Sequence, residues 1–197
     1  GLCGGFNSSI IRQVRTMASE VKASNKALKI FCVGRKGHDV LKREFPDAII
    51  DSVEGLGRRD VEYQEAIDVA VAITKLFESG HFDVCTIVFN QFQSAMTQIV
   101  TPQQLIPFEL TALASENQEN NITYSSEAVY IFEPEEEEIL TDLLPRNLAV
   151  QIFQALLESA ASEHGARMSA MDNATRNAGE MIDNLTLTYN RTRQAFI

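Results

Sequence analysis

The C-terminal third of the chain is almost free of residues that end helices. Between positions 135 and 197 the sequence contains one proline, Pro145, and two glycines, Gly165 and Gly179. We therefore predict a nearly unbroken helix over residues 146–197, with Pro145 at or near its first turn, where proline is tolerated. Such a helix would be roughly 78 Å long at about 1.5 Å per residue. A small domain cannot cover that length, so the pattern indicates a coiled-coil arm, a shaft or a lever.

A heptad pattern follows one side of this predicted helix. Steps of three and four residues connect a set of side chains over four heptads, which is typical of supercoiled packing; the set is Met168, Met171, Thr175, Ala178, Ile182, Leu185, Tyr189, Thr192 and Phe196. Ala, Thr and Met bury little area each, so the set favours a helix held in a fixed pair or a larger sleeve over a free-standing zipper. Residues 185–197 hold two arginines and no acidic residue. That composition suits a solvated helix C-terminus or contact with an acidic partner surface.

Charge and hydropathy exclude some classes of partner. The net charge is −10 with a pI near 4.8, which argues against nucleic acid as a partner. The sequence has no run of about 18 apolar residues, so no segment is predicted to span a membrane. Cys32 and Cys85 lie in apolar, strand-like runs and are predicted to be core thiols in a reducing compartment. The chain opens on Gly1 and stops inside a helical pattern, so we expect sequence to be missing at both ends.

Short apolar runs alternate with helical segments before the long helix. Strands are predicted at 28–33, 48–50, 82–90, 93–107 and 128–132, and helices after the N-cap residues 7–9, at 36–44 and at 60–79, with a polar loop at 111–126. This order implies a parallel sheet with a mixed edge, where Pro102 and Pro107 confine an antiparallel returning strand to the edge. We therefore predict an α/β fold: a Rossmann-like, mostly parallel sheet domain over 1–133 and a long C-terminal coiled-coil helix over 134–197.

No group of residues predicts catalysis or cofactor binding. The opening GLCGG turn precedes a helix, but it lacks the spacing of dinucleotide and P-loop motifs. We interpret it as a tight turn that binds neither ATP nor NAD. Cys3 has no neighbouring base in the sequence and is interpreted as a packed thiol. The acidic run at 135–138 follows Pro134, a probable first helical position, where acidic residues stabilise the helix dipole. No metal site is predicted, because the histidines lack ligand spacing.

Four segments carry a resemblance to a known family. ASEHGARMSAMDNATRNAGEMIDNLTLTYNRTRQAFI, at 161–197, resembles the C-terminal helix of the rotary (F-type) ATP synthase gamma subunit. GLCGGFNSSI at the start, FNQFQSAMTQ at 89–98 and YIFEPEEEEIL at 130–140 match further segments of that family in the same order. The resemblance extends over the whole chain and is strongest to the alphaproteobacterial and mitochondrial branch.

The resemblance implies a mechanical role. In this family an α/β domain is inserted between N- and C-terminal helices that pair as an antiparallel coiled coil. That pair is the axle inside a ring of alternating catalytic and noncatalytic subunits. The domain is a foot on the membrane rotor ring, beside the epsilon subunit (delta in mitochondrial naming). The implied location is peripheral, on the cytoplasmic face of a bacterial inner membrane or the matrix face of the mitochondrial one. The family's N-terminal helix and first strand have no counterpart here.

The resemblance also assigns roles to a few residues. Arg193 and Gln194, in the RTRQA motif, match positions that contact the catalytic subunits, and Arg191 would assist them. Phe132 and Glu133 match the foot segment that faces the membrane ring. The family's gamma subunit is a non-catalytic part of a proton-transporting complex and binds no nucleotide, which implies no cofactor here.

Two other interpretations remain open on the sequence. One is a Rossmann-like nucleotide-binding enzyme with a helical oligomerisation arm. Tight nucleotide binding by the isolated protein would favour it. The other is a coiled-coil adaptor protein, which stable self-association would favour.

Overall fold

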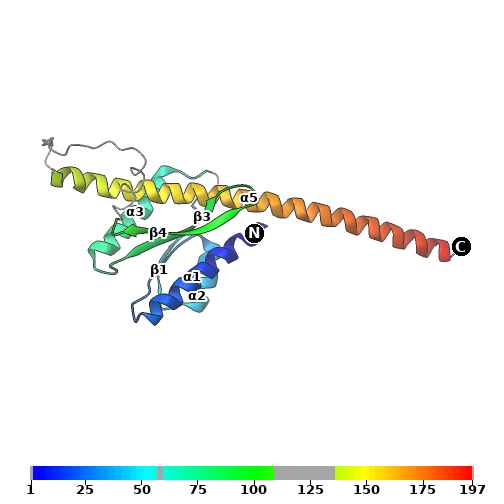
Figure 1. Ribbon diagram of the computed structural model, residues 1–197, viewed down its shortest axis with the longest axis horizontal. Coiled ribbons are helices and arrows are strands. Elements are labelled where there is room, and N and C mark those ends of the chain that lie inside the picture. The colour runs from blue at the N-terminus through cyan, green and yellow to red at the C-terminus, as the bar shows by residue number, and fades with distance from the viewer. Residues whose placement is uncertain (1, 57–59, 109–135, 197) are drawn as a thin grey trace, which may run out of the picture.

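The long C-terminal helix dominates the molecule. The computed structural model describes residues 2–56, 60–108 and 136–196. Helix α5 (Glu136–Ala195) is 60 residues long and lies along the α/β elements before its C-terminal half projects alone (Figure 1). The helix has no break between residues 150 and 190, so the predicted unbroken helix is confirmed.

The predicted start of the unbroken helix is wrong. Pro145 lies inside α5, well beyond the first turn. Residues 136–144 are mostly Glu and Leu, which are strong helix formers. Proline has no backbone N–H, so the helix lacks one hydrogen bond at Pro145 but continues past it. The domain boundary predicted at 133/134, Pro134, the loop at 111–126 and the strand at 128–132 lie outside the described residues.

An antiparallel hairpin supports the first half of α5. Strand β3 (Cys85–Phe92) pairs with β4 (Gln98–Ile106) in antiparallel register, with Val88 opposite Pro102. The returning antiparallel strand is therefore confirmed. It begins at Gln98 and not at 93, because residues 93–97 form the turn, in which Ser94 N–H donates to Thr97 O at 3.0 Å.

A parallel pair forms the second sheet of the described residues. Strand β1 (Ile30–Val33) pairs with β2 (Ile49–Val53), and α2 (Arg35–Glu44) connects them. Gly34 joins β1 to α2 with a φ of 105°, which glycine adopts without strain. Helix α1 (Phe6–Ala23) packs beside α2. The βαβ alternation predicted from the sequence is present as a small parallel sheet. The predicted mixed edge is not part of it, because among the described strands β3 and β4 pair only with each other and form a separate antiparallel sheet.

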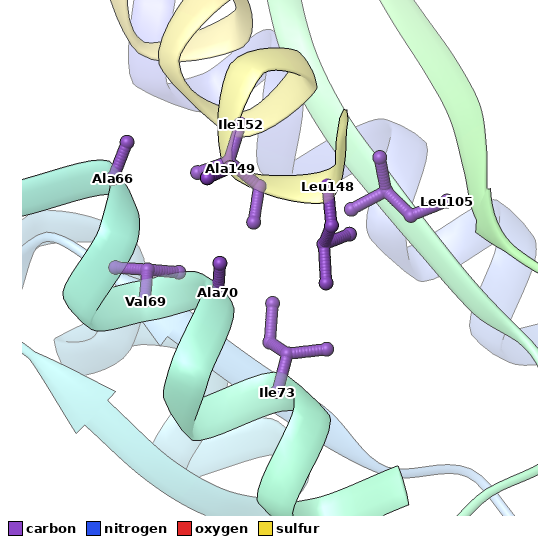
Figure 2. Packing of buried hydrophobic residues seen from close by; sticks show 8 residues of the cluster. All are labelled: Ala66, Val69, Ala70, Ile73, Leu105, Leu148, Ala149 and Ile152. Carbon is purple, nitrogen blue, oxygen red and sulfur yellow. The ribbon is translucent and has the colours of Figure 1, made fainter. Parts of the chain in front are cut away.

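The main core lies between α3 (Tyr63–Glu78), β4 and the first half of α5. Small and branched side chains from the three elements point toward one another (Figure 2); they are Ala66, Val69, Ala70, Ile73, Leu105, Leu148, Ala149 and Ile152. A smaller core joins α1, β1 and α2 through Ile11, Cys32 and Leu41. The first half of α5 is therefore an integral part of the domain, and its second half is not.

Candidate functional site

The projecting half of α5 is the candidate site, because its apolar side chains have no cover. From 171 to 196 every side chain is exposed except that of Asn190, which is half-buried. Ile182, Leu185 and Tyr189, members of the predicted heptad set, are 63%, 63% and 67% exposed. Exposed apolar surface on this scale is typical of an interaction site. The regular helix places the set along one side, as its spacing predicts.

The basic tip of α5 holds the three residues that the resemblance singled out. Arg191, Arg193 and Gln194 are exposed in the last turns of the helix. Within the described part of the chain, neither arginine has an ion-pair partner. Arg191 and Gln194, three residues apart, share a face of the helix, whereas residues two apart, such as Arg191 and Arg193, do not. The hydrogen-bond donors of the tip therefore point to more than one side of the helix. Both guanidinium groups are free to meet a carboxylate of a partner.

The opening turn is a packed helix entry. Gly4 has a φ of 54°, and Phe6 N–H donates to Cys3 O at 3.2 Å as α1 begins. Cys3 is 1% exposed, and Asn7 Nδ2 lies 3.5 Å from its sulfur. These contacts support the interpretation of Cys3 as a packed thiol. The absence of nucleotide binding at this turn stays a prediction.

A cavity of about 390 Å³ lies beside this turn. It is bounded by the start of α1, the β3–β4 turn and α5, and its lining includes Cys3, Asn90, Met96, Ala166 and Asn173. Asn90 is 1% exposed, and its Nδ2 donates to Phe6 O at 3.5 Å, while its Oδ1 has no hydrogen-bond partner among the described residues. The lining is a mixture of small, apolar and amide groups without a charged side chain, so it offers no strong anchor for an ionic ligand.

Cys32 and Cys85 lie in or against the two cores, as the sequence predicted. Cys32 is buried in the smaller core, and Cys85 is half-buried against the main core. Burial disfavours the thiolate and raises the pKa of both thiols. No described group of three His, Cys, Asp or Glu side chains comes together as a metal site would require. None of the helices in residues 2–56, 60–108 and 136–196 is both long and apolar enough to cross a membrane.

The structure leaves part of the predicted site untested and adds residues that the sequence did not single out. Phe132 and Glu133 lie outside the described residues. Glu158, Ser162 and Ser169 of α5 form hydrogen bonds to the β3–β4 hairpin. Their spacing of four and seven residues places them on one face of α5. Each is one position away from the predicted heptad set, so that set does not single them out.

Comparisons with known proteins agree with the resemblance. The family model described as "ATP synthase" matches residues 1–197. The ATP synthase gamma chain of Rhodospirillum rubrum is 53% identical over 197 residues, which are 100% of this chain and 66% of that protein. The gamma chain of Rhodopseudomonas palustris strain TIE-1 is 54% identical over 100% of this chain and 65% of its own length. The chain thus spans slightly less than two thirds of these curated relatives.

Solved structures show the same fold. A structure titled as the central stalk and c-ring of Tetrahymena thermophila mitochondrial ATP synthase matches with a TM-score of 0.68 and 30% identity, over 89% of this chain and 71% of that one. A structure titled as the Euglena gracilis mitochondrial ATP synthase rotor in rotational state 1 matches with a TM-score of 0.71 over 100% of this chain and 71% of that one. Its identity of 21% supports the fold alone.

Proposed function

The chain belongs to the ATP synthase gamma-chain family, and we propose that it is the central-stalk rotor subunit of a proton-translocating ATP synthase. In this proposal residues 1–133 are the foot domain and residues 134–197 are the shaft, whose first half is packed into the core of the foot. The subunit couples rotation of the membrane ring to conformational change at the catalytic subunits. The observation that carries the proposal is the projecting half of α5, whose apolar side chains are exposed from residue 171 onward. A side chain pattern of this kind needs a sleeve or a paired helix to cover it.

The role that we propose is mechanical and not catalytic. As the shaft turns, each catalytic subunit meets a different face of an asymmetric helix. Contacts that differ between rotary positions shift each catalytic site among states of different nucleotide affinity, which is coupling by differential contact. The chain itself would bind no nucleotide, metal or other cofactor.

The proposed partners follow from the two ends of the molecule. The shaft contacts the alternating catalytic and noncatalytic subunits. The foot contacts the membrane rotor ring through the segment containing Phe132 and Glu133, beside the epsilon subunit (delta in mitochondrial naming). The proposed location is therefore peripheral, on the cytoplasmic face of a bacterial inner membrane or the matrix face of the mitochondrial inner membrane.

Arg193 and Gln194 are proposed to contact the catalytic subunits, with Arg191 assisting. A planar guanidinium donates two parallel hydrogen bonds to one carboxylate, and a glutamine amide both donates and accepts. The exposure of these side chains supports the proposal, since neither is engaged within the domain. Such a contact would form in one rotary position and break in the others, so it would affect turnover more than assembly.

The test is the double variant Arg193→Ala with Gln194→Ala in the complete subunit, reconstituted into the complex. A hydrogen bond to a charged group contributes roughly 1.5–3 kcal/mol, so we expect turnover to fall about tenfold or more while assembly is retained. The chain offers a matched control, because Arg12 and Gln13 form the same dipeptide on α1, with Arg12 exposed. Arg12→Ala with Gln13→Ala should leave turnover unchanged. Normal turnover in the tip variant would show an ordinary helix surface, and failed assembly would show a structural role.

A further inference from the structure

A row of polar and small residues lines α5 where the helix crosses the hairpin. Glu158, Ser162, Gly165 and Ser169 are separated by steps of four, three and four residues, which place them on one face of the helix. The row spans roughly 16 Å at about 1.5 Å per residue. It continues the buried apolar face of Leu148, Ile152 and Ala155 toward the C-terminus, up to the point where α5 leaves the domain.

Three members of the row form hydrogen bonds to backbone groups of the hairpin. Phe92 N–H donates to Glu158 Oε2 at 2.7 Å. Ser162 donates to Asn90 O at 2.9 Å, and both residues are buried. Ser169 donates to Ala95 O at 2.9 Å. Backbone partners cannot change rotamer, so these bonds fix where each side chain lies along the hairpin.

Gly165 brings the two backbones close together. A Cβ at this position would lie 3.1 Å from Ala95 Cα, 3.2 Å from Phe92 Cε2 and 3.3 Å from Ala95 O. These distances are shorter than ordinary van der Waals contact, so a side chain at this position would require the hairpin to shift by a few tenths of an ångström. The helix cannot roll on the hairpin without moving a larger neighbouring side chain into this gap.

We propose that Glu158, Ser162, Gly165 and Ser169 are positioning residues that fix the rotational and axial register of α5 on the domain. This inference rests on the proposed function, in which torque passes between the foot and the shaft. Apolar packing is non-directional and roughly proportional to buried area, so the core around Ile152 alone would resist separation better than it resists rotation or sliding. The directed bonds of the row resist both, and they sit at the last contact before the helix projects.

The experiment uses the complete subunit in the whole complex, reconstituted into lipid vesicles. ATP hydrolysis per assembled complex and ATP-driven proton uptake are measured for Ser162→Ala with Ser169→Ala, and for Glu158→Ala. A register that slips under load lets the catalytic subunits continue to turn over while less rotation reaches the membrane ring. Because each variant removes bonds to neutral backbone groups, we expect the ratio of protons taken up to ATP hydrolysed to fall roughly threefold or more, with hydrolysis retained.

Two control variants separate the bonds from the bulk of the side chains. Glu158→Gln keeps an oxygen that can accept from Phe92 N–H, so coupling should be retained. Ser19→Ala removes a hydroxyl whose bond, to Arg15 O at 2.9 Å, lies within α1 itself, so coupling should also be unchanged.

The outcomes distinguish this inference from the proposed function. If the unmodified subunit neither assembles with the catalytic subunits nor supports hydrolysis, the proposed function fails. If the unmodified complex is coupled, and Glu158→Ala and the Ser162→Ala, Ser169→Ala double variant have the same proton-to-ATP ratio as that complex, the inference is overturned. Failed assembly of both of these variants, with Glu158→Gln failing equally, would also overturn it, since the row would then be needed for folding rather than for register.

Discussion

The two halves of α5 are one continuous helix in two different environments. In the first half Leu148, Ile152 and Ala155 are 3%, 1% and 2% exposed against α3 and the hairpin. In the second half Ile182 and Leu185 have the same apolar character and are both 63% exposed. Both halves repeat apolar residues at steps of three and four, so the pattern in the sequence does not distinguish a covered face from an uncovered one.

The difference shows where the helix obtains its stability. Most helical stability in proteins comes from packing of an apolar face rather than from intrinsic propensity. The first half receives that packing from its own domain, and from residue 171 to residue 196 the second half extends into solvent with no buried side chain. We therefore expect the second half to open locally more often than the first in the isolated chain. A partner that covered it would remove this difference.

The largest expected difference in stability is between two variants that each truncate one isoleucine, one in each half of α5. Ile152→Ala removes a fully buried side chain from the main core and should lower the free energy of unfolding by about 2–5 kcal/mol. Ile182→Ala removes an exposed one and should change it by less than about 0.5 kcal/mol. Urea unfolding of the purified protein measures both. Equal effects would mean that the second half is covered in solution, as in a self-associated bundle, which dilution of the protein would reveal.

A smaller effect, with opposite signs, is expected at the two glycines of the helix. Gly165→Ala introduces a Cβ about 3.1 Å from the hairpin backbone and should destabilise by about 1–3 kcal/mol. At Gly179 an added Cβ would meet no described atom within 4 Å outside the adjacent turns of α5, so Gly179→Ala should stabilise by up to about 1 kcal/mol through helix propensity. Thermal unfolding of the two variants checks the signs. A stabilising Gly165→Ala would show that the hairpin yields and that the close approach does not hold the helix.

Local sequence patterns predicted much of the fold. The alternation of apolar runs and helical segments predicted the parallel β1–β2 pair and the hairpin, because each signal is contained within a few residues. The unbroken helix followed from the scarcity of proline and glycine. Its start was missed because proline was treated as a helix boundary, whereas good helix formers on both sides carried the helix through Pro145.

Hydrogen bonds between residues far apart in the sequence could not be predicted from local patterns. Ser162 and Asn90 are 72 residues apart, and Ser169 and Ala95 are 74 apart. Serine is common on solvated helix faces, so nothing local distinguishes one that bonds to a distant carbonyl. The site residues at the tip of α5 came from the resemblance, since an exposed arginine pattern alone is equally typical of a solvated helix end.

The smallest effect concerns an ion pair that joins two helices of the domain. Arg15 on α1 donates from Nε to Glu44 Oε2 on α2 at 2.7 Å, and both side chains are partly exposed. The hydrogen bond from Arg15 lowers the pKa of Glu44 below its ordinary value near 4.5. Because the folded pKa is depressed, the stabilisation is present above the unfolded value and is lost as the pH falls through the folded one. Exposed pairs of this kind contribute little.

We therefore expect Glu44→Gln to be slightly less stable than the unchanged protein at pH 7 and equal to it once the pH has fallen below the folded pKa of Glu44. Urea midpoints measured across this range give the difference, and added salt should reduce it because exposed charges are screened. A difference that persists at acid pH and in salt would assign the effect to packing between α1 and α2. Stability between α1 and α2 would then come from buried contact rather than from the ion pair, as it does in the first half of α5.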